Sequence, residues 1–270
     1  MKESFQATIT DVGGTLNMIP FDFDNDVTPR VWFGYFDEDG TGIRARYWEY
    51  DHSANPLSAA ASFTTFPGVS SVSVIFPAAI STAAPGDVLN VNSGLDVYTL
   101  DIEGVQKADA FGMNITASVG FRYASMKQYF SSSVVRGPAT IGSLNWTREF
   151  EGGGLIAGGE ARKSLGGSAL SLVGSARGSL LYGEKTLQRT TVNDITPVGS
   201  RVSPNVILED ADEVSGIFEL TAGLEWSRAT KIGELYFRGS YETQLWTAAG
   251  APTLTFLGFD GIGLSIGLVR

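Results

Sequence analysis

The sequence predicts an all-β fold, an antiparallel up-and-down β-barrel of about ten strands, with eight and twelve strands as the alternatives. Three observations predict it. Apolar and polar residues alternate over segments longer than the five or six residues typical of soluble strands. The connections between these segments are alternately short and long. Charged residues gather on one face of the segments, and helical spacing of apolar residues is rare.

The longest alternating segment covers residues 108–126. One face is apolar, with Phe111, Ile115, Val119 and Phe121 among its members, whereas the other is small and polar and carries Arg122. The length and the two-residue period match a transmembrane β-strand, which needs about 9–11 residues. Other segments of the chain repeat this alternating pattern.

The composition suits one large domain over residues 1–270. Charged residues make up 18% of the chain, below the roughly 25% of soluble domains. The absence of cysteine excludes a disulfide framework and thiolate metal sites, and it is compatible with folding in the periplasm. A net charge of −10 argues against a nucleic-acid partner. No apolar run reaches about 18 residues, so no transmembrane helix is predicted. No secretory signal is visible at the start, and we expect a trimmed mature form or a fragment.

Nine segments between residues 29 and 270 have strong strand patterns, and a weaker one precedes them. The strong segments are 29–36, 41–51, 94–105, 108–126, 154–163, 169–183, 214–226, 233–246 and 258–270. Weak alternation over residues 4–12 supplies a tenth strand, which an even-numbered barrel with both ends on one side requires.

The connections predict how the strands are oriented. Short turns are expected near 37–40, 107–110, 164–168 and 228–232, and long loops near 53–92, 127–150, 184–213 and 247–257. This alternation places every short turn at one end of the meander and every long loop at the other, as in barrels with short periplasmic turns and long outer loops.

The charged residues indicate which face points inward. An arginine on the lipid face costs roughly 2–4 kcal/mol at mid-bilayer, so the charged faces are expected to line the lumen. The predicted lumen residues are Arg44, Arg46, Asp101, Glu103, Arg122, Glu160, Arg162, Arg177, Glu219, Glu225, Arg238 and Glu242. Two interpretations stay open: a salt-bridge network that fills a narrow barrel, or the lining of a small pore. Aromatic residues near strand ends (Tyr35, Tyr47, Trp226 and Trp246) form interface girdles or belong to ordinary core and loops.

Several segments resemble one known family, the pore-forming major outer membrane proteins of Legionella type, which also occur in planctomycetes. The resemblance rests on residues 29–36 (PRVWFGYF), 40–51 (GTGIRARYWEYD), 95–103 (LDVYTLDIE), 120–126 (GFRYASM), 159–162 (GEAR), 174–183 (GSARGSLLYG) and 259–270 (FDGIGLSIGLVR). It implies a barrel in the bacterial outer membrane with a porin-like role, no catalytic set and no cofactor. Outer-membrane lipid and the barrel-insertion machinery are the implied partners. The chain departs from the family at its start, which lacks a signal, and at Arg270, where many such barrels end on an aromatic residue.

No motif predicts catalysis or a firm metal site. His52 is the single histidine, with no nucleophile near it in the sequence, and a solvated strand-end residue is expected. Asp22, Asp24 and Asp26 form a weak candidate for a divalent ion, because the glycine and the distant glutamate of a calcium loop are missing; a solvated acidic loop is the alternative.

The sequence therefore predicts a porin-like outer-membrane channel for small polar solutes, not an enzyme. Two alternatives remain: a structural or adhesive barrel whose lumen is plugged by salt bridges, and a soluble lipocalin-like binder. The last would require the reverse facing, with apolar side chains inside.

Overall fold

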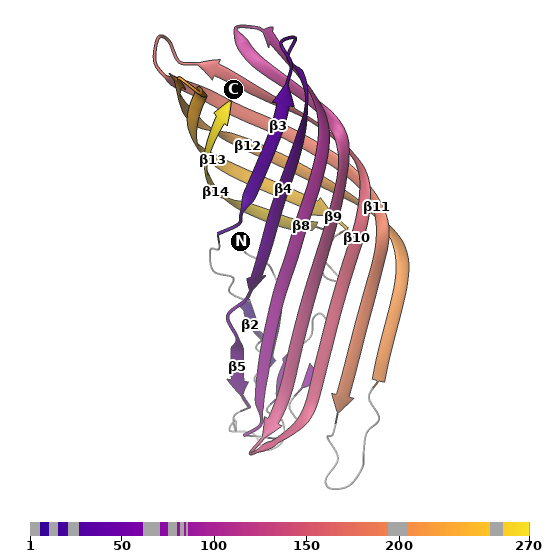
Figure 1. The fold of residues 1–270 in the computed structure, drawn as a ribbon. Coiled ribbons are helices and arrows are strands. Elements are labelled where there is room, and N and C mark those ends of the chain that lie inside the picture. The colour runs from indigo at the N-terminus through magenta and orange to yellow at the C-terminus, as the bar shows by residue number, and fades with distance from the viewer. Residues whose placement is uncertain are drawn as a thin grey trace.

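The structure, a computed structural model, is built of β-strands over the residues that it describes (Figure 1). It describes residues 6–10, 16–20, 27–61, 71–74, 80–81, 84, 86–193, 205–248 and 256–269. The strands are β1 Gln6–Thr10, β2 Leu16–Pro20, β3 Arg30–Phe36, β4 Thr41–Ser53, β5 Leu57–Ala60, β6 Ser71–Val74, β7 Ile80–Ser81, β8 Val88–Ala110, β9 Met113–Arg136, β10 Ala139–Ser164, β11 Leu170–Asn193, β12 Asn205–Thr230, β13 Gly233–Thr247 and β14 Phe256–Val269. Among the described residues, no helix is long and apolar enough to cross a membrane.

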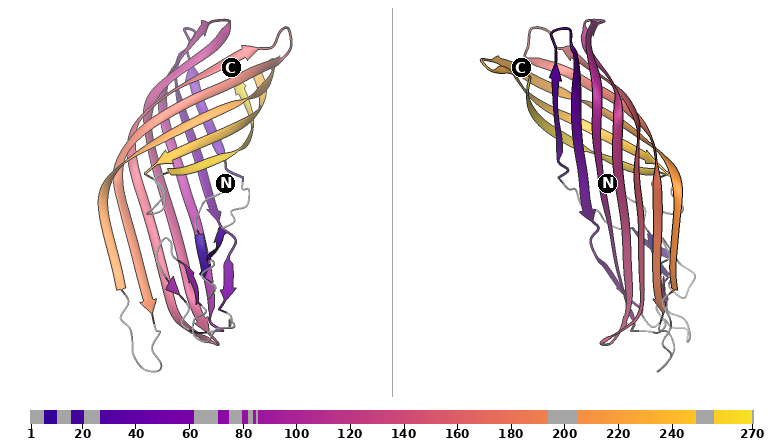
Figure 2. Two further views of the ribbon diagram at one scale, coloured as in Figure 1. Left: turned by 180° about the vertical axis from the view of Figure 1, so that it is seen from behind. Right: turned by 45° about the vertical axis from the view of Figure 1, so that its right-hand side comes forward.

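One large antiparallel sheet dominates the molecule. Its order is β14-β13-β12-β11-β10-β9-β8-β4-β3, with β5 paired to β8 beside this path, and it curls into a half-barrel (Figures 1 and 2). Consecutive strands on the path are antiparallel neighbours, which confirms the all-β, up-and-down prediction. Because nine described strands lie on the path, the edge strands β3 and β14 run in the same direction.

Residues 4–12 were expected to form the tenth strand of the barrel, and this prediction was wrong about the partners of the strand. Residues 6–10 are indeed a strand, but β1 pairs with β2 and β6, and these three form a separate four-stranded sheet with β7. The alternation over residues 4–12 is too short to span lipid, so the segment joins a smaller sheet instead.

Two of the expected long loops are strands. Residues 127–150 form the ends of β9 and β10, which meet at the turn Gly137 and Pro138, and most of 184–213 belongs to β11 and β12. Within 53–92 lie β5, β6, β7 and the start of β8. The gap 249–255 between β13 and β14 lies outside the described residues. Loops were expected because, in these segments, polar residues occupy the strand face that is apolar in the other predicted strands. The two-residue alternation of the strands was therefore not recognised.

The two faces of the sheet exchange character along each long strand. On β9, near its short turn, Val119 and Phe121 are exposed on the outer face while Arg122 is buried on the inner face. Further along, Met126 and Phe130 are buried on the inner face, and Lys127 is exposed on the outer face. The outer faces of the neighbouring strands change from apolar to polar at the same level. On β8 the exposed Leu100 and Ile102 are followed on this face by Asp96 and Asn92. On β10 the exposed Leu155 is followed by Glu151 and Asn145.

An apolar outer belt therefore covers the part of the sheet next to the short turns, whereas in the extension exposed apolar side chains such as Val206 and Leu208 are confined to β12 at its margin. Exposed apolar side chains of this belt include Phe33, Ile43, Leu100, Ile102, Val119, Phe121, Leu155, Leu172, Leu180, Phe218, Leu220, Phe237, Leu245, Ile262, Leu264 and Ile266. Such a belt is stable in contact with hydrocarbon and unfavourable in water. Beyond it, β8 to β12 continue as an extension past the ends of β3, β13 and β14 (Figure 2).

Tyrosines lie on the outer face where the belt ends. The rings of Tyr98 and Tyr123 contact each other at a tilt of 43° with their centroids 5.9 Å apart, and the Tyr47 hydroxyl donates to Glu49 Oε2 at 2.8 Å. Amphipathic rings of this kind prefer the boundary between lipid and water. Trp226, a girdle candidate, packs against Phe237 on the outer face. Trp246, another candidate, is fully buried on the inner face, so of its two interpretations the structure supports an ordinary core position.

The exchange of faces makes a matched prediction on one strand. Val119→Arg places a charge in the belt and is expected to destabilise the folded barrel by about 2–4 kcal/mol. Ser131→Arg, on the same face of β9 but in the extension, is expected to change stability by less than about 0.5 kcal/mol. Urea unfolding in lipid vesicles, followed by tryptophan fluorescence, measures both. Equal costs at the two positions would contradict the assignment of the belt to lipid.

Candidate functional site: the charged interior

Strand register brings the predicted lumen residues opposite one another. Arg46 and Arg122 both pair with Asp101, because β8 lies between β4 and β9. In the same way Arg44 faces Glu103, Arg177 faces Glu219 and Glu225 faces Arg238. Opposite charges at directly paired positions of a sheet stabilise that register.

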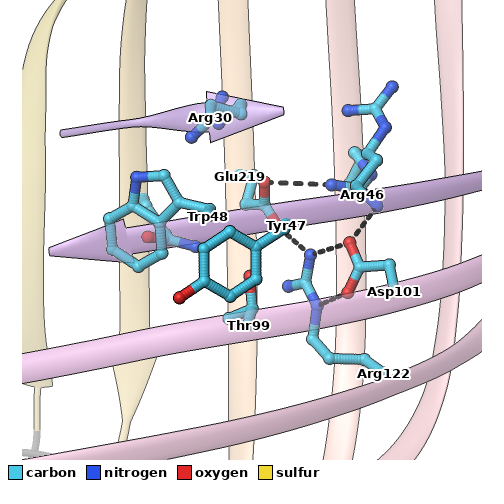
Figure 3. Close-up of a pocket in the computed structure, with 10 residues that line it drawn as sticks. Arg30, Arg46, Tyr47, Trp48, Thr99, Asp101, Arg122 and Glu219 are labelled. Carbon is cyan, nitrogen blue, oxygen red and sulfur yellow. Dashed lines mark hydrogen bonds and ion pairs between the residues drawn. The ribbon is translucent and has the colours of Figure 1, made fainter. Parts of the chain in front are cut away.

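The central cluster is built around Arg122 and Arg177, and Figure 3 labels Arg122 with its partners Asp101 and Glu219. Arg122 binds Asp101 in two-point geometry, with Nε to Oδ1 at 2.6 Å and a terminal nitrogen to Oδ2 at 2.8 Å, and it reaches Glu219 at 2.5 Å. Arg177 contacts Asp101 at 2.6 Å, Glu103 at 2.9 Å and Glu219 at 3.3 Å. These five side chains come from β8, β9, β11 and β12, so the cluster joins both walls of the curled sheet.

Two further arginines extend this cluster to β4. Arg44 Nε lies 2.9 Å from Glu103 Oε2, and Arg46 Nε lies 3.6 Å from the same atom. Glu103 is fully buried, and it also accepts a hydrogen bond from the Ser118 hydroxyl at 3.2 Å. One carboxylate therefore holds arginines of β4 and β11 together.

A second cluster lies closer to the short turns. Arg238 contacts Glu225 at 2.7 Å and Glu160 at 3.3 Å, and Arg162 contacts Glu225 at 2.8 Å. Arg162 also reaches Glu234 at 3.0 Å, a residue that the sequence reasoning missed because it lies at the start of its strand. Shared carboxylates again connect strands that are not neighbours in the sheet.

The twelfth predicted residue, Glu242 on β13, pairs with Arg30 on β3 at 2.5 Å. Arg30 was missed, although its alternation with Val31 and Phe33 places it on the polar face of its strand. β14 lies beside β13 at this edge, and its Gly263 leaves the necessary room, because a Cβ there would lie 2.6 Å from Glu242 Oε1. The ion pair thus links the two edges of the sheet by side chains.

The structure therefore places all twelve predicted residues in three ion-pair clusters on the inner face. Their role as the lining of a pore stays a prediction. Around the central cluster, a cavity of about 10 Å³ remains, bordered by Arg46, Thr99, Asp101, Arg122 and Gln244 among others. That volume corresponds to about one water molecule.

An apolar tier lies directly beyond the central cluster on the inner face. It consists of Trp48, Tyr50, Leu95, Val97, Ala124, Met126, Phe150, Leu181, Ile217, Trp246, Leu257 and Phe259, all buried. β4 and each strand from β8 to β14 contribute to it. Phe259 meets Trp48 and Tyr50 edge-to-face, with centroids 5.4 and 5.1 Å apart, which joins β14 to β4. Sequence reasoning missed this tier, although the same two-residue period contains it.

A pair of carboxylates lies outside the belt, past the tyrosines. Asp51 and Asp96 are directly paired on β4 and β8. Partial burial, followed by a hydrogen bond to Asp51 and the negative charge of Asp51, raises the pKa of Asp96 to about 6, while Lys127 acts in the opposite direction. Asp96 therefore changes its charge near pH 6.

Neither a metal site nor a catalytic arrangement emerges from the described part of the chain. It contains no group of three His, Cys, Asp or Glu side chains placed to hold a metal ion. The weak candidates Asp22, Asp24 and Asp26 lie outside the described residues. His52 is the penultimate residue of β4, where its ring lies 6.2 Å from that of Tyr50.

The curled sheet, its lipid-facing belt and its charged interior define a transmembrane β-barrel protein. A comparison with protein families identifies which kind. The model described as Legionella pneumophila major outer membrane protein precursor matches residues 2–255, so the chain belongs to this outer membrane protein family. The protein accordingly is an outer-membrane barrel of the bacterial cell envelope. No curated protein and no solved structure gives a significant match.

Removing one central arginine is expected to be costly. Arg177→Met leaves Asp101, Glu103 and Glu219 with one cation fewer in a buried site, which costs roughly 3–5 kcal/mol. Lys127→Met removes the exposed pair with Glu149 and is expected to cost less than about 1 kcal/mol. Equilibrium unfolding of both variants in vesicles measures the difference, and a cheap Arg177→Met would show that the cluster is not structural.

The carboxylate pair makes a pH-dependent prediction. The pKa of Asp96 is raised in the folded state, so its relative stabilisation is present at low pH and is lost as the pH rises through about 6. Asp96→Asn is therefore expected to raise the unfolding temperature at pH 8 by about 2–4 °C and to change it little at pH 4.5. Glu209→Gln, an exposed control on β12, should act alike at both pH values. An unchanged difference between pH 4.5 and pH 8 would refute the repulsion between Asp51 and Asp96.

Proposed function

We propose that the protein is a closed outer-membrane barrel that anchors and displays its β-sheet extension at the cell surface. The observation that carries the proposal is the filling of the barrel interior by two tiers, one of ion pairs and one of apolar side chains. This is the structural or adhesive alternative of the sequence interpretation, with the lumen plugged.

The two tiers block solutes for different reasons. In the charged tier, each central guanidinium already binds carboxylates, so a permeating ion would have to break buried pairs. In the apolar tier, Phe150, Leu181, Ile217 and Trp246 are at most 1% exposed, and water entering among them would find no hydrogen-bond partners. Narrow barrels of this strand number are commonly filled by their own side chains.

The extension has the features of a rigid displayed element. On its inner face, Phe130, Val134, Leu144 and Trp146 pack with Leu89 and Val91 of β8. Ala54, Ala61 and Ile80, from the connection between β4 and β8, cover this cluster. The extension therefore has a core of its own, which a simple mobile loop would lack. We propose that outer-membrane lipid contacts the belt and that the barrel-insertion machinery assembles it.

A porin-like channel is the second candidate. It is favoured by the seam between the edge strands β3 and β14, where the described residues show no backbone pairing and the side-chain contacts run from β3 to β13 and from β4 to β14. Rearrangement there would widen the lumen and expose the arginine and glutamate side chains to small polar solutes. The lipocalin-like alternative requires apolar side chains inside the barrel wall and charges outside, the reverse of the facing at the belt.

Planar-bilayer conductance distinguishes the two candidates. Refolded protein, verified by heat-dependent mobility on gels, is expected to insert without conductance steps at 100 mV in 1 M KCl. Regular single-channel steps from the folded protein would overturn the closed-barrel proposal and establish the channel.

A pair of variants tests whether the apolar tier is the seal. Trp246→Ala combined with Phe150→Ala removes two buried rings of the apolar tier, one from β13 and one from β10, and is expected to produce brief conductance steps or a marked rise in permeability to small ions. Trp226→Ala removes an indole from the outer face and should leave the membrane sealed. If both proteins conduct equally, the tier is not the barrier.

A further inference from the structure

The outer face of the extension carries an unusual uncharged surface. Two cross-strand rows define it, which we call the hydroxyl–amide face: Asn92, Ser131, Asn145 and Thr190 in one row, and Tyr129, Thr147 and Gln188 in the next. Neighbouring members are direct partners on adjacent strands, from β8 to β11 in the first row and from β9 to β11 in the second. All seven side chains end in a hydroxyl or an amide.

Tyr129 lies along this face and does not stand out from it. The hydroxyl end of its ring covers Gly94, where a Cβ would lie 2.1 Å from the ring carbon that bears the hydroxyl. The same hydroxyl is 2.5 Å from Ser53 Oγ on β4. The ring therefore spans from β9 over β8 towards β4, and glycine at position 94 is required for that placement. The result is an aromatic platform beside a row of polar groups.

The chemistry of this face fits an uncharged carbohydrate. Hydroxyl and amide groups both donate and accept, which matches the hydroxyls of a sugar, and an aromatic ring packs against the C–H face of a pyranose. Same-face positions repeat about every 4.8 Å across strands and about 6.8 Å along them, which gives a flat lattice for an extended chain. Charged groups, common on solvent-facing sheets, are missing from both rows although the chain has a net charge of −10.

Flanking charges select against acidic polymers. Between the tyrosines and the hydroxyl–amide face lie Asp51, Asp96 and Glu149, with Lys127 among them, and Glu151 is level with Tyr98. This acidic border repels polyanions such as nucleic acids and sulfated or uronic-acid polysaccharides, and it has no comparable effect on a neutral chain.

We propose that the hydroxyl–amide face binds neutral polysaccharide. Such a chain would lie across β8 to β11, with a sugar ring on Tyr129 and its hydroxyls bonded to Asn145, Thr147 and Gln188. This inference rests on the proposed display function, because it assigns the partner class that the displayed extension recognises.

Binding of the folded, detergent-solubilised full chain to polysaccharide particles tests the proposal. The probes are four neutral polymers (cellulose, chitin, mannan and starch) and one acidic polymer, alginate, with depletion from solution as the readout. Saturable binding to at least one neutral polymer and none to alginate is expected. Failure with all four neutral polymers, or binding to alginate alone, would overturn the proposal.

Matched variants locate the site. Asn145→Asp with Thr190→Asp changes two neutral side chains to charged ones of similar size, and Tyr129→Ala removes the platform; each is expected to weaken binding at least tenfold. Gln106→Glu, which adds one charge near the short turn between β8 and β9, should bind like the parent. Unchanged binding by correctly folded face variants would place the polysaccharide elsewhere and overturn the assignment. Bilayer conductance of the same preparations reports on the closed barrel separately, so the two proposals can fail independently.

Discussion

A strand that crosses lipid and continues into water has to exchange its two faces, and this constraint organises the whole molecule. Within lipid, apolar side chains such as Val119 and Leu264 face outward, and the charged residues can only face inward. Beyond the tyrosines, the outer face meets water, and the apolar side chains of the same strands turn to the inner face as Met126 and Phe130. On β9 the two-residue period continues from Val119 through Phe130, so one continuous strand is in contact with lipid at one end and with water at the other.

The charged interior follows from that constraint. Once a belt faces lipid, arginines and carboxylates of the same strands are forced together in a narrow space, where each buried charge needs a partner. In the part of the interior enclosed by the belt, seven arginines (30, 44, 46, 122, 162, 177 and 238) meet seven carboxylates (101, 103, 160, 219, 225, 234 and 242) in the described ion pairs. Balanced numbers permit every charge to be compensated without a bound ion. The network also fixes the relative position of strands that are far apart in the sheet, such as β8 and β11.

The apolar tier next to the ion pairs gives the barrel a core that resembles that of a soluble protein. It is continuous with the two edges of the sheet through Phe259, Trp48 and Tyr50. Closure by aromatic packing and by the Arg30–Glu242 pair compensates in part for the lack of a described backbone ladder between β3 and β14. In the closed barrel that we propose, the extension is the part accessible from outside, and it is where we propose a surface function.

The sequence by itself determined the fold class, the strand face that points to lipid and the charged residues that point inward. The two-residue alternation and the cost of placing a charge in lipid can both be evaluated strand by strand. It also identified Arg122 and Asp101 as members of one interior, since their parity follows from their own strands. The tertiary structure alone decided which charges meet: Arg177 reaches Asp101 and Glu103 only because the sheet curls. It also decided that residues 127–150 continue as strand, that Trp246 points inward and that residues 6–10 join another sheet. The physical reason is that the polar face of a strand points inward where the strand crosses lipid and outward where it meets water. No local sequence pattern marks where the lipid ends.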